Sequence, residues 1–324
     1  MKALILKKVG LYKLDNAPQP RPGPDEVVIE VKIAGFCSTD LKVLKYGHRD
    51  LVLPCIPGEE VVGKVVEKGS DVEEIELGDR VYIYPGTSCR VCKNCIKGAE
   101  NLCERMQIMG FHRPGGFAEY VLSPQASVIK IPDTISFEEA VFAEPLSCCL
   151  NAIELSGLKS GESVGIWGAG PVGNLLKRVA LALGAYPTII EPYAPRMAFA
   201  NGIDNPAGLT FDVCFVAVGS PSAYREALNC LTARGRLVIF SGLLNDQKYI
   251  EIDFNTIHYK EQSVVGSYGS CLRHAVRALQ LIEDKAVIVE DLITHRFSLD
   301  EIEKAIQVVE ERKGMKVLIY PNSG

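Results

Sequence analysis

The chain has 324 residues, 47% of them hydrophobic, which is enough for two domains that each bury a core. Its formal net charge of −5 and its lack of a Lys- and Arg-rich block argue against nucleic acid or an anionic membrane as the main partner. No apolar run reaches the ~18 residues of a membrane span, and segment 1–8 is charged too early for a signal peptide, so we expect a cytoplasmic protein.

Short runs of alternating or continuous apolar residues, separated by Gly and Pro, occupy the chain up to about residue 150. Such runs predict antiparallel β-strands, so we expect this first part to be mostly β. The clearest runs are 26–33, 61–66, 80–84 and 118–122.

Four cysteines in the spacing C-x2-C-x2-C-x7-C interrupt this β pattern: Cys89, Cys92, Cys95 and Cys103. Four thiolates from one short loop can surround Zn²⁺ at about 2.3 Å, and such a closed shell leaves no position open for chemistry. We therefore expect a structural zinc. An iron–sulfur cluster uses the same ligands and is the alternative. Disulfides are disfavoured, because the chain has 11 Cys, an odd number, and shows no signal peptide.

From residue 163 the pattern changes to strand, helix, strand. The apolar runs 163–167 and 188–191 flank a helical run at 172–183, an alternation typical of a doubly wound parallel sheet. Further elements are predicted as strands at 212–218 and 236–240, helices at 223–231 and 272–283, and a final helix at 301–312 and strand at 315–320 that could return to the first domain.

The turn after the first of these strands reads Gly168-Ala-Gly-Pro-Val-Gly173, a G-x-G-x-x-G between strand and helix. In this position the glycines allow a tight turn, a close approach of a pyrophosphate, and tight packing of helix on strand. Glu191 closes the next strand, and a carboxylate there accepts hydrogen bonds from ribose hydroxyls and repels a 2′-phosphate. We therefore expect NAD rather than NADP.

The alternative is a purely structural glycine turn beside a solvated glutamate. The candidate cofactor-binding residues are Gly168, Gly170, Pro171, Val172, Gly173, Glu191, Arg196, Gly219, Gly242 and Ser267.

A cysteine loop in a β domain together with a dinucleotide turn in an α/β domain resembles the zinc-containing medium-chain alcohol dehydrogenase family, especially its sorbitol and threonine dehydrogenase branch. The resemblance covers nearly the whole chain. Its further landmarks, in order, are Gly35-Phe-Cys-Ser-Thr-Asp40, Gly58-Glu-Glu60, Leu77-Gly-Asp-Arg-Val81, Gly115-Gly-Phe-Ala-Glu-Tyr120, Ala143-Glu-Pro-Leu-Ser147 and Lys316-Val-Leu-Ile319.

The resemblance implies an α/β protein with a GroES-like, mostly β catalytic domain and a Rossmann domain with a doubly wound parallel sheet. We expect residues 1–151 and 285–324 to form the catalytic domain and residues 152–284 the NAD-binding domain. We also expect a homo-oligomer, a dimer or tetramer, that acts on a small-molecule substrate, and from the charge and composition we expect neither nucleic acid nor membrane as a partner.

In the family that this chain resembles, a second, catalytic metal is bound by a Cys, a His and an acidic residue or Cys. Here Cys37 and Glu144 match, but Glu59 stands where the family has histidine, and Glu60 follows it. These four are the candidate catalytic-metal ligands. Carboxylate in place of imidazole weakens Lewis acidity and favours harder ions such as Mn²⁺, although Zn²⁺ also accepts carboxylate.

The family's proton relay is also altered, because its two further histidines are replaced by Lys42 and Asn151. A lysine can shuttle a proton when its pKa is lowered. His48 is a second candidate relay, with an exposed loop histidine as the alternative. Thr39 holds the family's hydroxyl position next to the substrate, with a turn residue as the alternative.

A further departure lies between 202–204 and 211–213, where the family has a helix and a strand and this chain has about six residues. That length fits a loop, so we expect a trimmed nucleotide domain.

Together these features predict a metal-dependent oxidoreductase that transfers hydride between a secondary alcohol, such as a polyol or sugar, and NAD. Asp40, Lys42, Glu60 and Arg113 are expected to line a polar substrate site. Two alternatives remain: a reductase that keeps only the structural zinc, and a sensor that binds NAD without turnover.

Overall fold

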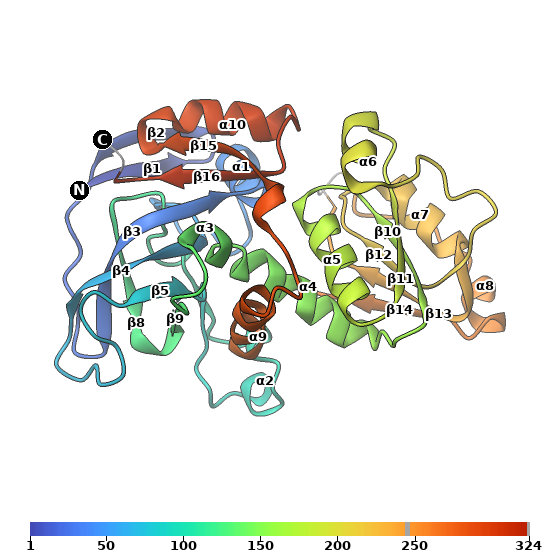
Figure 1. The fold of residues 1–324 in the computed structure, drawn as a ribbon, viewed down its shortest axis with the longest axis horizontal. Coiled ribbons are helices and arrows are strands. Elements are labelled where there is room, and N and C mark those ends of the chain that lie inside the picture. The colour runs from blue at the N-terminus through green and yellow to red at the C-terminus, as the bar shows by residue number, and fades with distance from the viewer. Residues whose placement is uncertain (244–246, 323–324) are drawn as a thin grey trace. The chain divides into compact units, whose positions relative to one another are not determined.

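The computed structural model describes residues 1–243 and 247–322, shown as a ribbon in Figure 1. The chain divides into two compact units, Met1–Glu144 with Cys271–Gly324 (unit 1) and Pro145–Ser270 (unit 2). None of the described helices is long and apolar enough to cross a membrane.

Unit 1 is built around a seven-stranded sheet of order β15-β16-β3-β4-β5-β9, in which β8 also pairs with β3. The final strand β16 pairs antiparallel with β3, so the chain end returns to the first domain as the sequence predicts. The strands of unit 1 are β1 (Lys2–Lys8), β2 (Leu11–Asn16), β3 (Glu26–Phe36), β4 (Glu60–Lys68), β5 (Arg80–Ile83), β6 (Gly86–Thr87), β7 (Gln107–Ile108), β8 (Tyr120–Pro124), β9 (Val128–Lys130), β15 (Ile293–Ser298) and β16 (Lys316–Tyr320).

The sheet of unit 1 encloses an apolar core that includes Leu4, Leu6 and the stacked rings of Phe36 and Phe117, 5.4 Å apart. Helix α10 lies over β15 and β16 (Figure 1). The helices of unit 1 are α1 (Ser38–Tyr46), α2 (Lys93–Ile96), α3 (Phe137–Ala140), α9 (Leu272–Glu283) and α10 (Ile302–Glu310), and α4 (Ala143–Ser156) begins in unit 1 and continues in unit 2.

Unit 2 is a five-stranded parallel sheet of order β11-β10-β12-β13-β14, with α5 and α7 on its two faces (Figure 1). The general doubly wound sheet has six strands in the order 3-2-1-4-5-6, counted along its own domain. The sheet of unit 2 has this order without the outer strand that is third in that count. In the described segment 203–210 a single bridge, Ile190 to Ile203, remains of that strand, so the trimmed domain is as predicted. Its elements are β10 (Ser163–Trp167), α5 (Pro171–Ala182), β11 (Tyr186–Ile190), α6 (Ala194–Ala200), β12 (Phe211–Val216), α7 (Pro221–Asn229), β13 (Leu231–Ile239), α8 (Phe254–Tyr259) and β14 (Ser263–Gly266).

The two compact units have bounds that differ from the predicted domains 1–151 with 285–324 and 152–284. The main difference is α9, which belongs to unit 1. Two contacts fix it to the cysteine loop: the Arg273 guanidinium donates to the Gly98 carbonyl at 2.7 Å, and the Cys271 thiol donates to the Asn101 side chain at 3.2 Å.

A buried carboxylate joins α3 to the segment after α9. Glu139 accepts hydrogen bonds from the Ser136 backbone and hydroxyl, both at 2.7 Å, and pairs with the ammonium of Lys285. Burial acts to raise the pKa of Glu139, but the bonds from Lys285 and Ser136 outweigh it and lower this pKa to about 2.

A group whose pKa is lowered by folding adds stability above its unfolded pKa and loses it as the pH falls. We expect Glu139→Gln to lower the free energy of unfolding by about 1 to 2 kcal/mol at pH 7, a figure reduced for the solvent around half-exposed Lys285. The difference from wild type should shrink between pH about 5 and 2. Urea unfolding followed by circular dichroism at matched pH measures it, and a pH-independent difference would contradict the assignment.

Candidate functional site

The four cysteines of the loop come together around one point. Their sulfur atoms all lie within 4.8 Å of one another, and Cys92 is 3.5 Å from Cys95 and 3.9 Å from Cys103. A tetrahedron with metal–sulfur distances of 2.3 Å has sulfur–sulfur edges of about 3.8 Å. The loop is therefore already shaped for one Zn²⁺.

Backbone N–H groups point at the sulfurs. The Cys89 N–H donates to Cys103 Sγ at 3.2 Å, and the Arg105 N–H donates to the same sulfur at 3.3 Å. Hydrogen bonding from the Val91 N–H lowers the pKa of the Cys89 thiol to about 6. Such bonds favour the thiolate form, which is the form that binds metal.

The candidate catalytic ligands of unit 1 lie around the end of β3. Cys37 follows β3 and caps α1, accepting the Thr39 N–H at 3.3 Å, and Glu144 opens α4. Glu59 directly precedes Glu60, the first residue of β4.

Glu60 is buried and pairs with the buried ammonium of Lys316, the first residue of β16. Gly35 makes this pair possible, since a Cβ at Gly35 would lie 1.7 Å from the Glu60 carboxylate. Burial acts to lower the pKa of Lys316, but Glu60 and Cys37 outweigh it and raise this pKa, so the side chain stays an ammonium.

The cluster holds more negative groups than Lys316 can balance. Burial, followed by the carboxylate of Glu144, raises the pKa of Glu59 well above its usual range. Burial also raises the pKa of Asp40 to about 7 and that of the Cys37 thiol well above its usual value. A divalent cation would allow these groups to ionise together, so the donor set fits a metal in its chemistry.

The same set is less well arranged than the cysteine loop. Among the residues that the structure describes, only the four loop cysteines form a group of three or more His, Cys, Asp or Glu with all ligand atoms within 4.8 Å. The ligand atoms of Cys37, Glu59 and Glu144 are therefore spread more widely than a closed metal site requires.

The candidate proton-relay residues lie on and after α1. Thr39 is half-buried in its first turn, and Lys42 is exposed. His48 lies beyond its end, where Nδ1 accepts the Asp50 N–H at 3.2 Å and the ring packs edge-on against Phe111. Burial lowers the pKa of His48, which favours the neutral ring.

Arg113, expected among the polar lining residues, donates to the Thr87 hydroxyl at 2.8 Å. This contact ties it to β6, at the base of the cysteine loop.

The candidate cofactor residues of unit 2 all follow the carboxyl ends of parallel strands, the edge at which such sheets bind ligands. Gly168 follows β10, Gly170 caps α5, and Pro171 and Val172 open that helix. A Cβ at Gly173 would lie 1.8 Å from the Gly168 carbonyl, so only glycine permits this approach of helix and strand.

Glu191, after β11, lies against the Gly-rich turn. Its carboxylate accepts the Ala169 N–H at 2.9 Å and the Tyr193 N–H at 3.0 Å. Arg196, in the first turn of α6, brings its guanidinium to 3.6 Å from where a Cβ of Gly170 would stand. A fixed carboxylate and a guanidinium therefore lie beside the Gly-rich turn.

The remaining candidates follow the other strands. Gly219 and Gly242, after β12 and β13, are close neighbours, since a Cβ at Gly219 would lie 2.9 Å from the Gly242 carbonyl. Ser267, after β14, donates its N–H to the Ile239 carbonyl at 3.0 Å. The structure thus places all ten candidates along one edge of the sheet.

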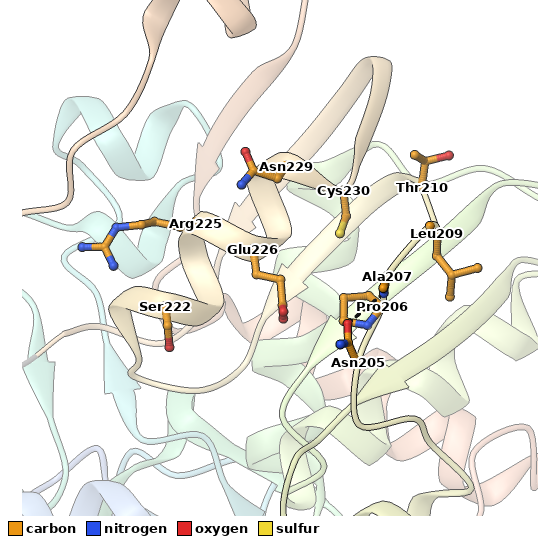
Figure 2. Close-up of a pocket in the computed structure, with 11 residues that line it drawn as sticks. Asn205, Pro206, Ala207, Leu209, Thr210, Ser222, Arg225, Glu226, Asn229 and Cys230 are labelled. Atoms are coloured by element: carbon orange, nitrogen blue, oxygen red, sulfur yellow. Dashed lines mark hydrogen bonds between the residues drawn. The ribbon is translucent and has the colours of Figure 1, made fainter.

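A hollow of about 620 Å³ opens elsewhere in unit 2, between α7 and loop 205–210 (Figure 2). The loop leads into the amino end of β12, opposite the carboxyl edge that carries the cofactor candidates. Figure 2 shows Arg225 pointing away from the loop residues, so the polar groups of this hollow do not converge on one point.

Comparisons with known proteins agree with this arrangement. Residues 23–133 match the family model "Alcohol dehydrogenase GroES-like domain", and residues 177–284 match "Zinc-binding dehydrogenase". The L-threonine 3-dehydrogenase of Chelativorans sp. (strain BNC1) is 31% identical over 98% of each chain.

Solved structures show the same fold over nearly the whole chain. A Sinorhizobium meliloti 1021 protein described as a zinc-binding dehydrogenase and bound to NADP is 33% identical, with a TM-score of 0.92 over 99% of each chain. The 2R,3R-butanediol dehydrogenase of Bacillus subtilis is 29% identical, with a TM-score of 0.91 over 99% of each chain.

Proposed function

Because the chain belongs to the zinc-containing medium-chain alcohol dehydrogenase family, in its threonine and sorbitol dehydrogenase-like branch, we propose that it transfers hydride between a secondary alcohol and NAD. The observation that carries the proposal is the pairing of a cysteine loop shaped for zinc with a Gly-rich turn and carboxylate at the edge of a parallel sheet. The substrate class we propose is a polyol, sugar or other hydroxy compound.

We propose that the four loop cysteines hold a structural zinc, and that Cys37, Glu59 and Glu144 hold a catalytic divalent metal. Glu60 is less suited than the other three, because Lys316 already pairs with its carboxylate. A metal held there would polarise the alcohol oxygen, and the nicotinamide would accept the hydride.

The protein's own groups then position and deprotonate the alcohol. We place the Thr39 hydroxyl next to the substrate oxygen, where it would accept the departing proton. Asp40 holds the Cys37 backbone through a 2.8 Å hydrogen bond and so orients the ligand loop. Lys42 and His48 remain candidates for passing the proton to solvent, Lys42 by its exposure and His48 by its place beside Phe111.

We also propose that the chain forms a homo-oligomer. Strand β14 ends the described sheet of unit 2, and Val264 on it and Ile239 beside it are exposed apolar residues. An edge strand presents backbone groups that can pair with a second copy.

The purified wild-type chain tests the proposal as a whole. Two metals per chain and NADH formation with polyols, sugar acids or amino alcohols support a dehydrogenase. One metal with reduction of an activated double bond favours the reductase alternative. One metal and NAD binding without turnover favours the sensor. Light scattering on the same sample gives the number of chains.

Cofactor choice gives a separate prediction. We expect Glu191→Ala to raise the ratio of kcat/KM for NADP to that for NAD by about tenfold or more, because it removes the charge that opposes a 2′-phosphate while Arg196 stays near the turn. Glu191→Gln keeps the size of the side chain and should shift the ratio in the same direction. A wild type that already prefers NADP would contradict the role of Glu191.

A further inference from the structure

The segment 267–270 follows β14 and so begins at the carboxyl edge of the sheet of unit 2. The β12, β13 and β14 strands form the second half of the doubly wound sheet. The first half carries the pyrophosphate turn and the adenosine-side Glu191, so the second half is left for the nicotinamide mononucleotide. The backbone of this segment is therefore a candidate wall of the nicotinamide site.

Helix α4 holds this segment through one face. Ser147 and Asn151 are four residues apart, so they lie on the same side of the helix, and both are buried. The Ser147 and Ser270 hydroxyls are 2.7 Å apart. The Asn151 amide nitrogen donates to the Gly269 carbonyl at 2.9 Å.

The Asn151 amide also has two longer contacts in the same segment. Its nitrogen is 3.5 Å from the Tyr268 carbonyl and 3.5 Å from the Ser267 hydroxyl. An amide nitrogen carries two hydrogens, so it can serve two of these three acceptors at once. Neither Ala nor Asp can donate here, and Asp would place a negative charge against carbonyl oxygens.

The same helix also reaches the pyrophosphate end of the site. The Cys149 thiol points at the Val172 carbonyl, 3.7 Å away, in the first turn of α5. Helix α4 therefore touches both the Gly-rich turn helix and segment 267–270, and it fixes the spacing between the two ends of the cofactor site.

We propose that Asn151 is a positioning residue for the cofactor, which holds the backbone of 267–269 in the shape that receives the nicotinamide half of NAD. This inference rests on the proposed function. It gives a role to a residue that the sequence marks only as the loss of a family histidine, since a histidine at this place can donate one hydrogen bond where asparagine donates two.

Two measurements on the full chain test this role. Hydrogen exchange of the cofactor-free protein should show faster exchange at residues 267–270 in Asn151→Ala than in wild type. NADH fluorescence titration should show a dissociation constant raised about five- to tenfold, the effect of about one to two lost hydrogen bonds. The KM for NAD should rise more than kcat falls. Asn151→His should recover part of the affinity, and it serves as the test variant where Asn151→Ala does not fold.

Ser156→Ala is the matched control, because Ser156 is a buried polar residue of the same helix whose hydroxyl bonds locally to the Ile153 carbonyl. It should leave both measurements at the wild-type values. Unchanged exchange at 267–270, or an NADH dissociation constant within twofold of wild type in Asn151→Ala, overturns the proposal. A wild type that binds no nicotinamide cofactor overturns the proposed function and this inference together, so the two failures are distinguishable.

Discussion

Replacing Cys92 with serine is expected to remove one zinc per chain and to lower the melting temperature by about 5 to 10 °C. Each 1 kcal/mol lost from the free energy of unfolding lowers Tm by about 2 to 4 °C in a domain of this size. Apart from its hydrogen bonds to Cys271 and Arg273, the loop has little packing to order it. Its large apolar side chains, Val91, Ile96 and Leu102, are between 51% and 76% exposed, and α2 is only four residues long. Metal–thiolate bonds therefore supply most of its folding free energy.

Cys230→Ser is the control for this prediction, because Cys230 is a half-buried cysteine of unit 2 far from the loop in sequence. It should leave the metal content unchanged. NADH binding should survive in Cys92→Ser, since the candidate cofactor residues belong to unit 2. Plasma mass spectrometry of the desalted proteins measures the zinc, and equal zinc in Cys92→Ser and wild type would remove the assignment.

The second large effect is expected at Glu59. If its carboxylate binds the catalytic metal, Glu59→Gln should lose that metal and lower kcat at least tenfold, because a neutral amide oxygen is a weaker ligand. Glu59→His should tighten Zn²⁺ at the same place, since borderline-soft zinc accepts imidazole well, and should shift the preferred metal away from Mn²⁺. The structural zinc and NADH binding should stay unchanged in both variants.

Glu67→Gln is the control for the Glu59 variants, because Glu67 is an exposed glutamate on β4, the strand that begins directly after Glu59. The metal content and the rate of Glu67→Gln should match those of wild type. If the two Glu59 variants also keep wild-type metal content and rate, Glu59 is a half-buried carboxylate that binds no metal, and the reductase and sensor alternatives gain weight.

Local patterns in the sequence predict most elements but not where each one packs. The amphipathic run 272–283 is the helix α9 with the same bounds, yet it belongs to unit 1 rather than to the nucleotide domain. The contacts that place it, from Cys271 and Arg273 to the cysteine loop, join residues about 170 positions apart. Periodicity reports which face is apolar and carries no information about such a distant partner.

The residues of the candidate site also fall into two groups: those that local sequence motifs predict, and those that meet only through distant packing. The cysteine spacing and the Gly-rich turn are compact motifs whose geometry follows from sequence, and the structure brings their residues together. The pairing of Glu60 with Lys316 depends on β16 docking beside β3, so it is visible only in three dimensions. The catalytic metal ligands and the relay residues stay predictions, because their roles depend on groups that the protein binds.

The place of β16 also governs the order in which the chain can fold during synthesis. Strand β3 emerges early, but one of its sheet neighbours, β16, begins at Lys316, after all of unit 2 has been made. Residues 145–270 contain their own sheet and can fold before the last strand of unit 1 has been synthesised. A nascent chain that stops before Lys316 leaves β3 with an open edge and Glu60 without its ammonium, an arrangement that invites pairing with other nascent chains.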